Sequence, residues 1–133
     1  METRQTRPTI LVVEDIESNY LLVSYILRDI YDLLWAHDGI EALELFRTHH
    51  VDLILMDFRM PRLGGLDTTA QIRRTDPTTP IIALTAFAFD NNREEALKAG
   101  CTDFMAKPID GTLLKNKIGA LLSAPDKTSK STD

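Results

Sequence analysis

The sequence VDLILMDFRMP, residues Val51 to Pro61, is an apolar run that ends on a carboxylate. Leu53 to Met56 are all apolar, which is typical of a strand buried on both faces of a parallel sheet. Asp57 follows directly, and burying a lone carboxylate is costly. The stretch therefore raises the question of why a core strand delivers Asp57 at its end.

The composition predicts one ordinary globular domain. The chain has 133 residues, of which 44% are hydrophobic and 26% charged, and this is enough for one core. The net charge is 15 − 20 = −5, which argues against non-specific nucleic-acid binding. No apolar run approaches the roughly 18 residues of a membrane span, and the N-terminus has no secretory core region. A single cysteine, Cys101, excludes an internal disulfide, so we expect a cytoplasmic protein.

Strand-like and helix-like segments alternate along the chain. Strands are predicted over Thr9–Val13, Leu33–Ala36, Leu53–Met56, Ile81–Leu84 and Asp103–Ala106. Helices are predicted over Ser18–Ile30, around Ala42, Leu43 and Phe46, over Leu66–Arg74, over Asn91–Ala99 closed by Gly100, and around Leu114, Ile118 and Leu121. This alternation predicts an α/β fold, a three-layer (βα)5 sandwich with a parallel five-stranded sheet. We expect the domain over residues 9–123, an N-terminal extension over 1–8 and a disordered tail over 124–133.

Polar side chains follow four of the five predicted strands. Glu14 and Asp15 follow the first, Asp57 the third, Thr85 the fourth and Lys107 the fifth. Each has an ordinary explanation when taken alone, such as a helix cap for Asp15 or a solvated surface lysine for Lys107. Because ligands of such folds bind beyond the carboxyl ends of the strands, the combination predicts a site at this edge.

The charges of these residues indicate a chemistry. Two carboxylates about 5 Å apart repel by about 3 kcal/mol at an effective dielectric constant near 20. Three of them favour a divalent cation with oxygen ligands, above all Mg²⁺. A metal, a lysine and a hydroxyl together suit a phosphoryl group, and an aspartate can itself accept that group.

Four pieces of the sequence carry a resemblance to a known family: ILVVED, LILMDFRMPRLGGL, IIALTA and KAGCTDFMAKPI. In this order and spacing they resemble the receiver domains of two-component response regulators. The resemblance covers nearly the whole chain and implies a flavodoxin-like sheet with strand order 2-1-3-4-5. The piece IIALTA, and Glu14 where an Asp is commoner, resemble receivers attached to hybrid sensor kinases.

The resemblance implies a role for each site residue. Asp57 becomes the phosphoacceptor, and Mg²⁺, with Mn²⁺ as an alternative, is held by oxygen ligands at this edge of the sheet. These ligands are Asp15, Asp57, the backbone carbonyl of Arg59, and Glu14 through a water molecule. Phosphoryl contacts come from Lys107 and Thr85, and the switch residues are Thr85 and Phe104.

The resemblance also implies partners and an output. A histidine kinase or a histidine phosphotransfer protein supplies the phosphoryl group, so the chain is a signalling phosphoacceptor and not an enzyme. The face formed by the helix at 91–99, the strand at 103–106 and the last helix is expected to bind a downstream protein. Arg59 and Phe87 lie beside the expected route of the hydrolytic water, and neither orients water well, so slow self-dephosphorylation is expected. An inward-turning Lys107 before Pro108 predicts a cis peptide bond at this position.

Three alternative functions are weaker. A haloacid-dehalogenase-type phosphatase needs a second aspartate two residues after the first, where this chain has Arg59. An FMN carrier needs a Ser/Thr-rich loop after the first strand, where this chain has the acidic EDIESN. A receiver-like interaction module that is never phosphorylated does not need the intact acidic trio with Thr85 and Lys107.

Overall fold

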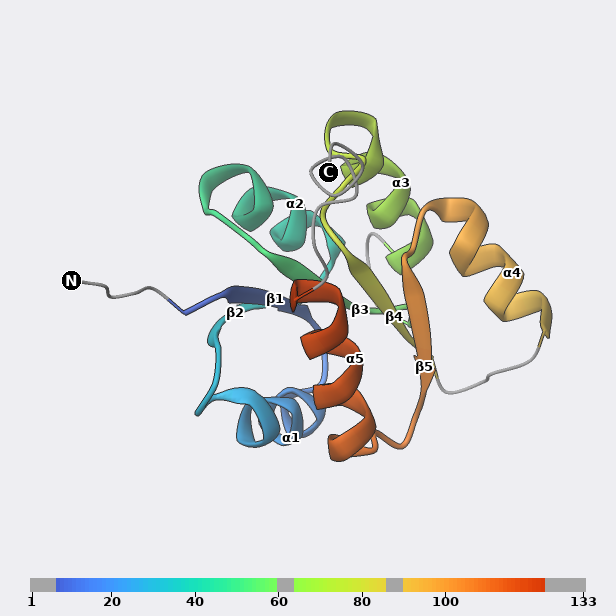
Figure 1. The fold of residues 1–133 in the computed structure, drawn as a ribbon. Helices are drawn as coiled ribbons and strands as arrows, with labels where there is room; N and C mark the ends of the chain where they lie inside the picture. The colour runs from blue at the N-terminus through green and yellow to red at the C-terminus, as the bar shows by residue number, and fades with distance from the viewer. Residues whose placement is uncertain (1–6, 60–63, 86–89, 124–133) are drawn as a thin grey trace, which may run out of the picture.

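The computed structural model describes residues 7–59, 64–85 and 90–123, in which five strands and five helices alternate (Figure 1). In chain order the elements are β1 (Thr9–Val13), α1 (Glu17–Leu27), β2 (Asp32–Ala36), α2 (Gly39–Thr48), β3 (Leu53–Asp57), α3 (Gly65–Thr75), β4 (Ile81–Thr85), α4 (Asp90–Ala99), β5 (Asp103–Ala106) and α5 (Gly111–Ser123). None of the helices in these ranges combines the length and the apolar character needed to cross a bilayer.

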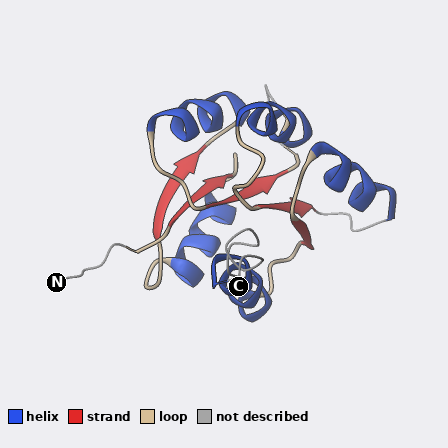
Figure 2. Ribbon diagram, turned by 45° about the horizontal axis from the view of Figure 1, so that its top comes forward, coloured by secondary structure: helices blue, strands red, loops and turns tan. Residues whose placement is uncertain are grey.

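The five strands form one parallel sheet in the order β2-β1-β3-β4-β5. Helices α1 and α5 cover one face of the sheet, and α2, α3 and α4 cover the other (Figure 2). The predicted three-layer fold and its strand order are therefore confirmed. The carboxyl ends of all five strands meet at one edge of the sheet, because the strands are parallel.

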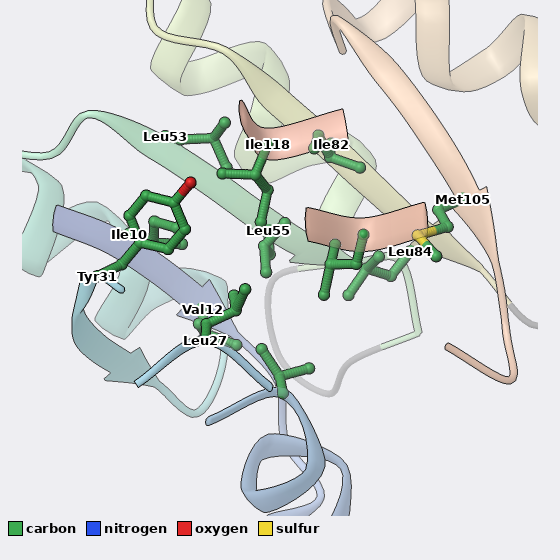
Figure 3. Packing of buried hydrophobic residues seen from close by; sticks show 12 residues of the cluster. Ile10, Val12, Leu27, Tyr31, Leu53, Leu55, Ile82, Leu84, Met105 and Ile118 are labelled. Atoms are coloured by element: carbon green, nitrogen blue, oxygen red, sulfur yellow. The ribbon is translucent and has the colours of Figure 1, made fainter. Parts of the chain in front are cut away.

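Apolar residues fill both interfaces between the sheet and its helices. Ile10 and Val12 of β1 pack toward α1 and α5 (Figure 3). Leu11 and Val13 of the same strand pack toward α2, α3 and α4. Successive side chains of a strand point to opposite faces, so a strand covered on both faces must be apolar throughout. This is why the central strands are uninterrupted apolar runs in the sequence.

Helix α1 is shorter than predicted, ending at Leu27 instead of Ile30. The guanidinium of Arg7 donates hydrogen bonds to the backbone carbonyls of Arg28, Asp29 and Tyr31. Carbonyls at a helix end need a partner, and here a residue from before β1 supplies it. The prediction was wrong at this end because the stabilising contact comes from another part of the chain.

Two local backbone predictions are confirmed. Gly100 has a φ of +115° and follows the last residue of α4, a conformation that glycine adopts without steric cost. The peptide bond between Lys107 and Pro108 is cis. The predicted disordered tail, residues 124–133, lies outside the described residues.

Candidate functional site

Three carboxylates meet at the carboxyl edge of the sheet. Glu14 and Asp15 directly follow β1, and Asp57 is the last residue of its neighbour β3. Each of these residues contributes one carboxylate oxygen, and the three oxygens lie within 4.8 Å of one another. Glu14 is only 1% exposed and Asp57 only 2%. The sheet therefore holds negative charge in a place where water screens it poorly.

Lys107 compensates part of this charge. Its Nζ lies 3.4 Å from Glu14 Oε1 and 3.4 Å from Asp57 Oδ2. Its backbone N–H donates to the carbonyl oxygen of Thr85, which fixes the chain beyond β5 against β4. With all three carboxylates ionised, the four charged side chains still carry a net charge of −2, the charge that one divalent cation balances.

The surroundings of Glu14 disfavour its charged form. Burial, and next repulsion from Asp57, raise the pKa of Glu14 from 4.5 to about 7. Lys107 and the backbone N–H of Ile16 act in the opposite direction but do not offset these effects. The cluster thus holds more negative charge than its protein neighbours neutralise.

The Asp15 carboxylate is a second indication that this cluster binds a cation. Its Oδ1 is buried and has no hydrogen-bond partner among the described residues. Asp15 does not cap α1 either, since the N-cap position is Ile16 and no side chain caps that helix end. A buried carboxylate oxygen without a partner is costly, whereas oxygen ligands of this kind suit Mg²⁺. The residues present therefore fit a magnesium ion.

Asp57 is held at both carboxylate oxygens. Oδ1 accepts a hydrogen bond of 3.0 Å from the backbone N–H of Arg59, and Oδ2 faces Lys107. The neighbouring strand β4 ends in Thr85, which is only 7% exposed. The expected phosphoacceptor, lysine and hydroxyl thus come from the ends of three adjacent strands.

Two of the remaining predicted residues, Phe104 and Arg59, belong to the described part of the chain. Phe104 of β5 is half-buried, and the Arg93 guanidinium lies 5.4 Å from its ring centroid. The Arg59 side chain is exposed. Phe87, which was predicted to tune hydrolysis together with Arg59, lies outside the described residues.

Two residues that the sequence analysis did not single out contact Glu14. The Asn19 side chain lies 3.4 Å from Glu14 Oε2, and the Trp35 indole N–H donates to the Glu14 carbonyl oxygen at 2.7 Å. Trp35 is the only tryptophan of the chain and stands near the end of β2, beside β1. The sequence places Trp35 on a predicted strand, but its contact with Glu14 could not be predicted from the sequence.

Comparison with known proteins gives a consistent result. The family model described as "Response regulator receiver domain" matches residues 10–119. The polar-differentiation response regulator DivK of Brucella ovis is 36% identical over 104 residues, which are 76% of this chain and 85% of DivK.

Solved structures agree in fold. The receiver domain of the sensor histidine kinase PA1611 from Pseudomonas aeruginosa has a TM-score of 0.83 at 35% identity, covers 90% of this chain and is itself covered completely. That structure has a magnesium ion coordinated in its active-site cleft. The co-crystal structure of the Saccharomyces cerevisiae phosphotransfer protein Ypd1 with the receiver domain of Ssk1 contains a chain with a TM-score of 0.82 at 27% identity. The match covers 90% of this chain and 91% of that one.

Proposed function

Since the chain belongs to the response regulator receiver domain family, we propose that Asp57 accepts a phosphoryl group from a histidine of a partner protein in two-component signalling. Receiver domains of this family are signalling phosphoacceptors and not enzymes. The observation that carries the assignment is the cluster of Glu14, Asp15 and Asp57 facing Lys107, with Asp15 Oδ1 buried and without a hydrogen-bond partner among the described residues.

The metal belongs to the same proposal. Asp15, Asp57 and the backbone carbonyl of Arg59 would hold Mg²⁺ directly, and Glu14 would act through a water molecule. When bound, the ion neutralises carboxylate and phosphoryl charge at the moment of transfer. Support comes from Asp15 Oδ1, which has no hydrogen-bond partner within the described ranges, and from the magnesium ion in the PA1611 receiver. Mn²⁺, which takes the same oxygen ligands, is the expected substitute.

The transfer step uses groups that already face one another. A carboxylate oxygen of Asp57 attacks the phosphorus of the phosphohistidine, and a P–O bond forms as the P–N bond breaks. The histidine nitrogen keeps the electron pair and takes up a proton. Lys107, now 3.4 Å from Asp57 Oδ2, would then contact a phosphoryl oxygen. Strand β3 and the Arg59 N–H hold the Asp57 carboxylate in place for this step.

Incubation with acetyl phosphate and Mg²⁺ tests the function without a protein partner. We expect the intact mass to rise by one phosphoryl group, and EDTA to prevent the rise. A mass that stays unchanged in Mg²⁺ would favour the alternative, a receiver-like interaction module that is not phosphorylated.

The partner must cover the edge where Asp57 lies, and helix α1 offers an apolar surface beside it. The large apolar side chains exposed there are Ile16 (51%), Leu21 (53%), Leu22 (45%) and Tyr25 (71%). Next to them is a hollow of about 380 Å³, lined by residues that include Leu22, Glu14 and Lys107. A contiguous exposed apolar patch marks an interaction site more often than scattered residues do. We place the docking site of the histidine-bearing partner here.

Replacing Leu21 and Tyr25 together with serine separates docking from chemistry. Transfer from a phosphohistidine partner should slow by at least about tenfold, because two exposed apolar contacts are lost at about 1 kcal/mol each. Phosphorylation by acetyl phosphate should keep its wild-type rate. The matched control is Ile40→Ser on α2, where the side chain is 50% exposed on the other face of the sheet. Equal transfer rates for wild type and the double variant would place the docking site elsewhere.

A switch at Thr85 and Phe104 extends the proposal. A phosphoryl group on Asp57 offers the Thr85 hydroxyl a new acceptor, and movement of Thr85 would free space for the Phe104 ring. The ring now lies under the Arg93 guanidinium, an attraction of about 0.5–1 kcal/mol at an exposed site. This contact favours the present orientation, so phosphorylation must supply at least that difference to shift the population. The surface of α4, β5 and α5 is the one that would change and bind the downstream protein.

Thr85→Ala is expected to uncouple phosphorylation from this surface. The variant should still gain one phosphoryl group, because Thr85 is not the acceptor. Phosphorylation-dependent changes in the amide chemical shifts of α4 and β5 should fall to less than about half, since the hydroxyl that senses the phosphate is missing. Thr85→Ser, which keeps the hydroxyl, should restore them. Full shift changes in the alanine variant would show that the coupling runs through other residues.

Arg59 and Phe87 remain predicted to slow self-dephosphorylation. Arg59 is exposed beside Asp57, which is compatible with that role.

A further inference from the structure

Strand β2 holds the backbone of Glu14 through two hydrogen bonds, one at its N–H and one at its carbonyl oxygen. The Glu14 N–H donates to the carbonyl oxygen of Ala36 at 2.9 Å. The Glu14 carbonyl oxygen accepts a hydrogen bond from the indole N–H of Trp35 at 2.7 Å. The first bond continues the sheet ladder by one residue. The second comes from a side chain and fixes the peptide that joins Glu14 to Asp15.

The Trp35 indole itself stacks against two aromatic rings. Tyr20 of α1 stacks on one side, with a centroid distance of 4.2 Å and an interplanar angle of 2°. His37 stacks on Trp35 at 4.1 Å and 26°. Glu41 Oε1 lies 2.6 Å from both the backbone nitrogen and Nδ1 of His37. The indole therefore has little freedom to turn its N–H away from Glu14.

The position of the Glu14–Asp15 peptide matters because Asp15 has few constraints of its own. Its Oδ1 has no hydrogen-bond partner among the described residues, so that oxygen is placed mainly by the backbone that carries it. The peptide group is a rigid plane. Rotating it would move the backbone atoms that carry the side chains of Glu14 and Asp15. A hydrogen bond to its carbonyl oxygen resists that rotation.

From these contacts we propose that Trp35 is a positioning residue for the metal site, acting through the Glu14–Asp15 peptide. The inference rests on the proposed function, in which Glu14 and Asp15 serve Mg²⁺. Partners that orient the ligands of a metal typically change its affinity by 10–100-fold when they are removed. Trp35 is not among the proposed metal ligands, so it would contribute geometry alone.

The test is titration of the metal-free 133-residue chain with Mg²⁺ by calorimetry. Trp35→Phe keeps an aromatic ring in the stack but removes the N–H. We expect its dissociation constant for Mg²⁺ to rise by roughly tenfold. The matched control is Leu33→Ala, a half-buried residue two positions earlier on β2 that packs into the core. It should lower stability toward urea while leaving the affinity of the folded protein for Mg²⁺ unchanged.

A second measurement uses the wild-type chain, so it does not depend on the folding of a variant. As the single tryptophan, Trp35 gives one indole N–H signal in the NMR spectrum. Its exchange with solvent should be slow in the metal-free protein and slower still with Mg²⁺ bound.

The possible outcomes distinguish the proposed function from the positioning role of Trp35. If the wild-type chain does not bind Mg²⁺, the proposed function fails. If the wild-type chain binds Mg²⁺ but Trp35→Phe binds it within twofold as well, the function stands and the role of Trp35 is refuted. Exchange of the indole proton as fast as in free tryptophan would refute that role too.

Discussion

Asp57→Asn is expected to abolish phosphorylation by acetyl phosphate, with no mass gain in the presence of Mg²⁺. An amide is nearly the same shape as a carboxylate, so β3 should keep its place in the sheet. The amide lacks the ionised oxygen that attacks phosphorus. The other two carboxylates of this edge, Glu14 and Asp15, serve the metal in the proposed function. The loss should therefore be complete.

The matched control lies at the other end of the same strand. Asp52 precedes β3, and its carboxylate accepts a hydrogen bond from the Thr9 backbone N–H at 2.8 Å. Asp52→Asn removes one negative charge from the opposite edge of the sheet and should be phosphorylated like wild type. A phosphoryl group on the Asp57→Asn protein, located by peptide mapping, would assign the acceptor role to another residue.

Gly65→Ala should destabilise the fold by about 2 kcal/mol. A Cβ at this position would lie 2.7 Å from the Asp57 carbonyl oxygen and 2.8 Å from Phe58 Cα. It would also lie 2.6 Å from Phe58 Cδ1. The first two atoms belong to the backbone and cannot move aside as a side-chain tip can. Overpacking of this kind typically costs 1–3 kcal/mol and occasionally more, and the gain in helix propensity from alanine, at most about 1 kcal/mol, offsets only part of it.

The adjacent glycine provides the control. A Cβ on Gly64 would meet nothing within 4 Å, so Gly64→Ala should change the free energy of unfolding by less than about 1 kcal/mol, which is the scale of an N-cap substitution. Urea unfolding of both metal-free variants, followed by circular dichroism, measures the difference. Equal stabilities would mean that α3 can move away from the end of β3 at little cost.

The sequence alone was sufficient to predict an element of the fold where a single segment of the chain determines that element. The apolar runs of β1, β3 and β4 locate these strands to within one residue, because each is buried on both faces. The true ends of β3 and β4 include Asp57 and Thr85, since backbone pairing continues past the last apolar side chain. The same parallel pairing gathers the polar residues at one edge, so the candidate site could be predicted from their order along the chain.

Contacts between distant segments were not predictable in this way. The end of α1 depends on Arg7, which lies outside the periodic pattern of that helix. The hydrogen bond from Trp35 to Glu14 and the Arg93 guanidinium over Phe104 depend on side-chain orientation across elements. Residue spacing within one element carries no information about such contacts.

Lys107 and Glu14 are 93 residues apart in the chain, and this separation bears on how the protein is made. Synthesis proceeds from the N-terminus at about 5–20 residues per second, so Asp57 leaves the ribosome well before Lys107. A growing chain that stops short of β5 has the acceptor carboxylate but lacks the lysine that balances its charge. It also lacks β5, which pairs with β4, the neighbour of β3 in the sheet. An unfinished chain should therefore be a poor phosphoryl acceptor. Incomplete copies would not remove phosphoryl groups from the histidine partner.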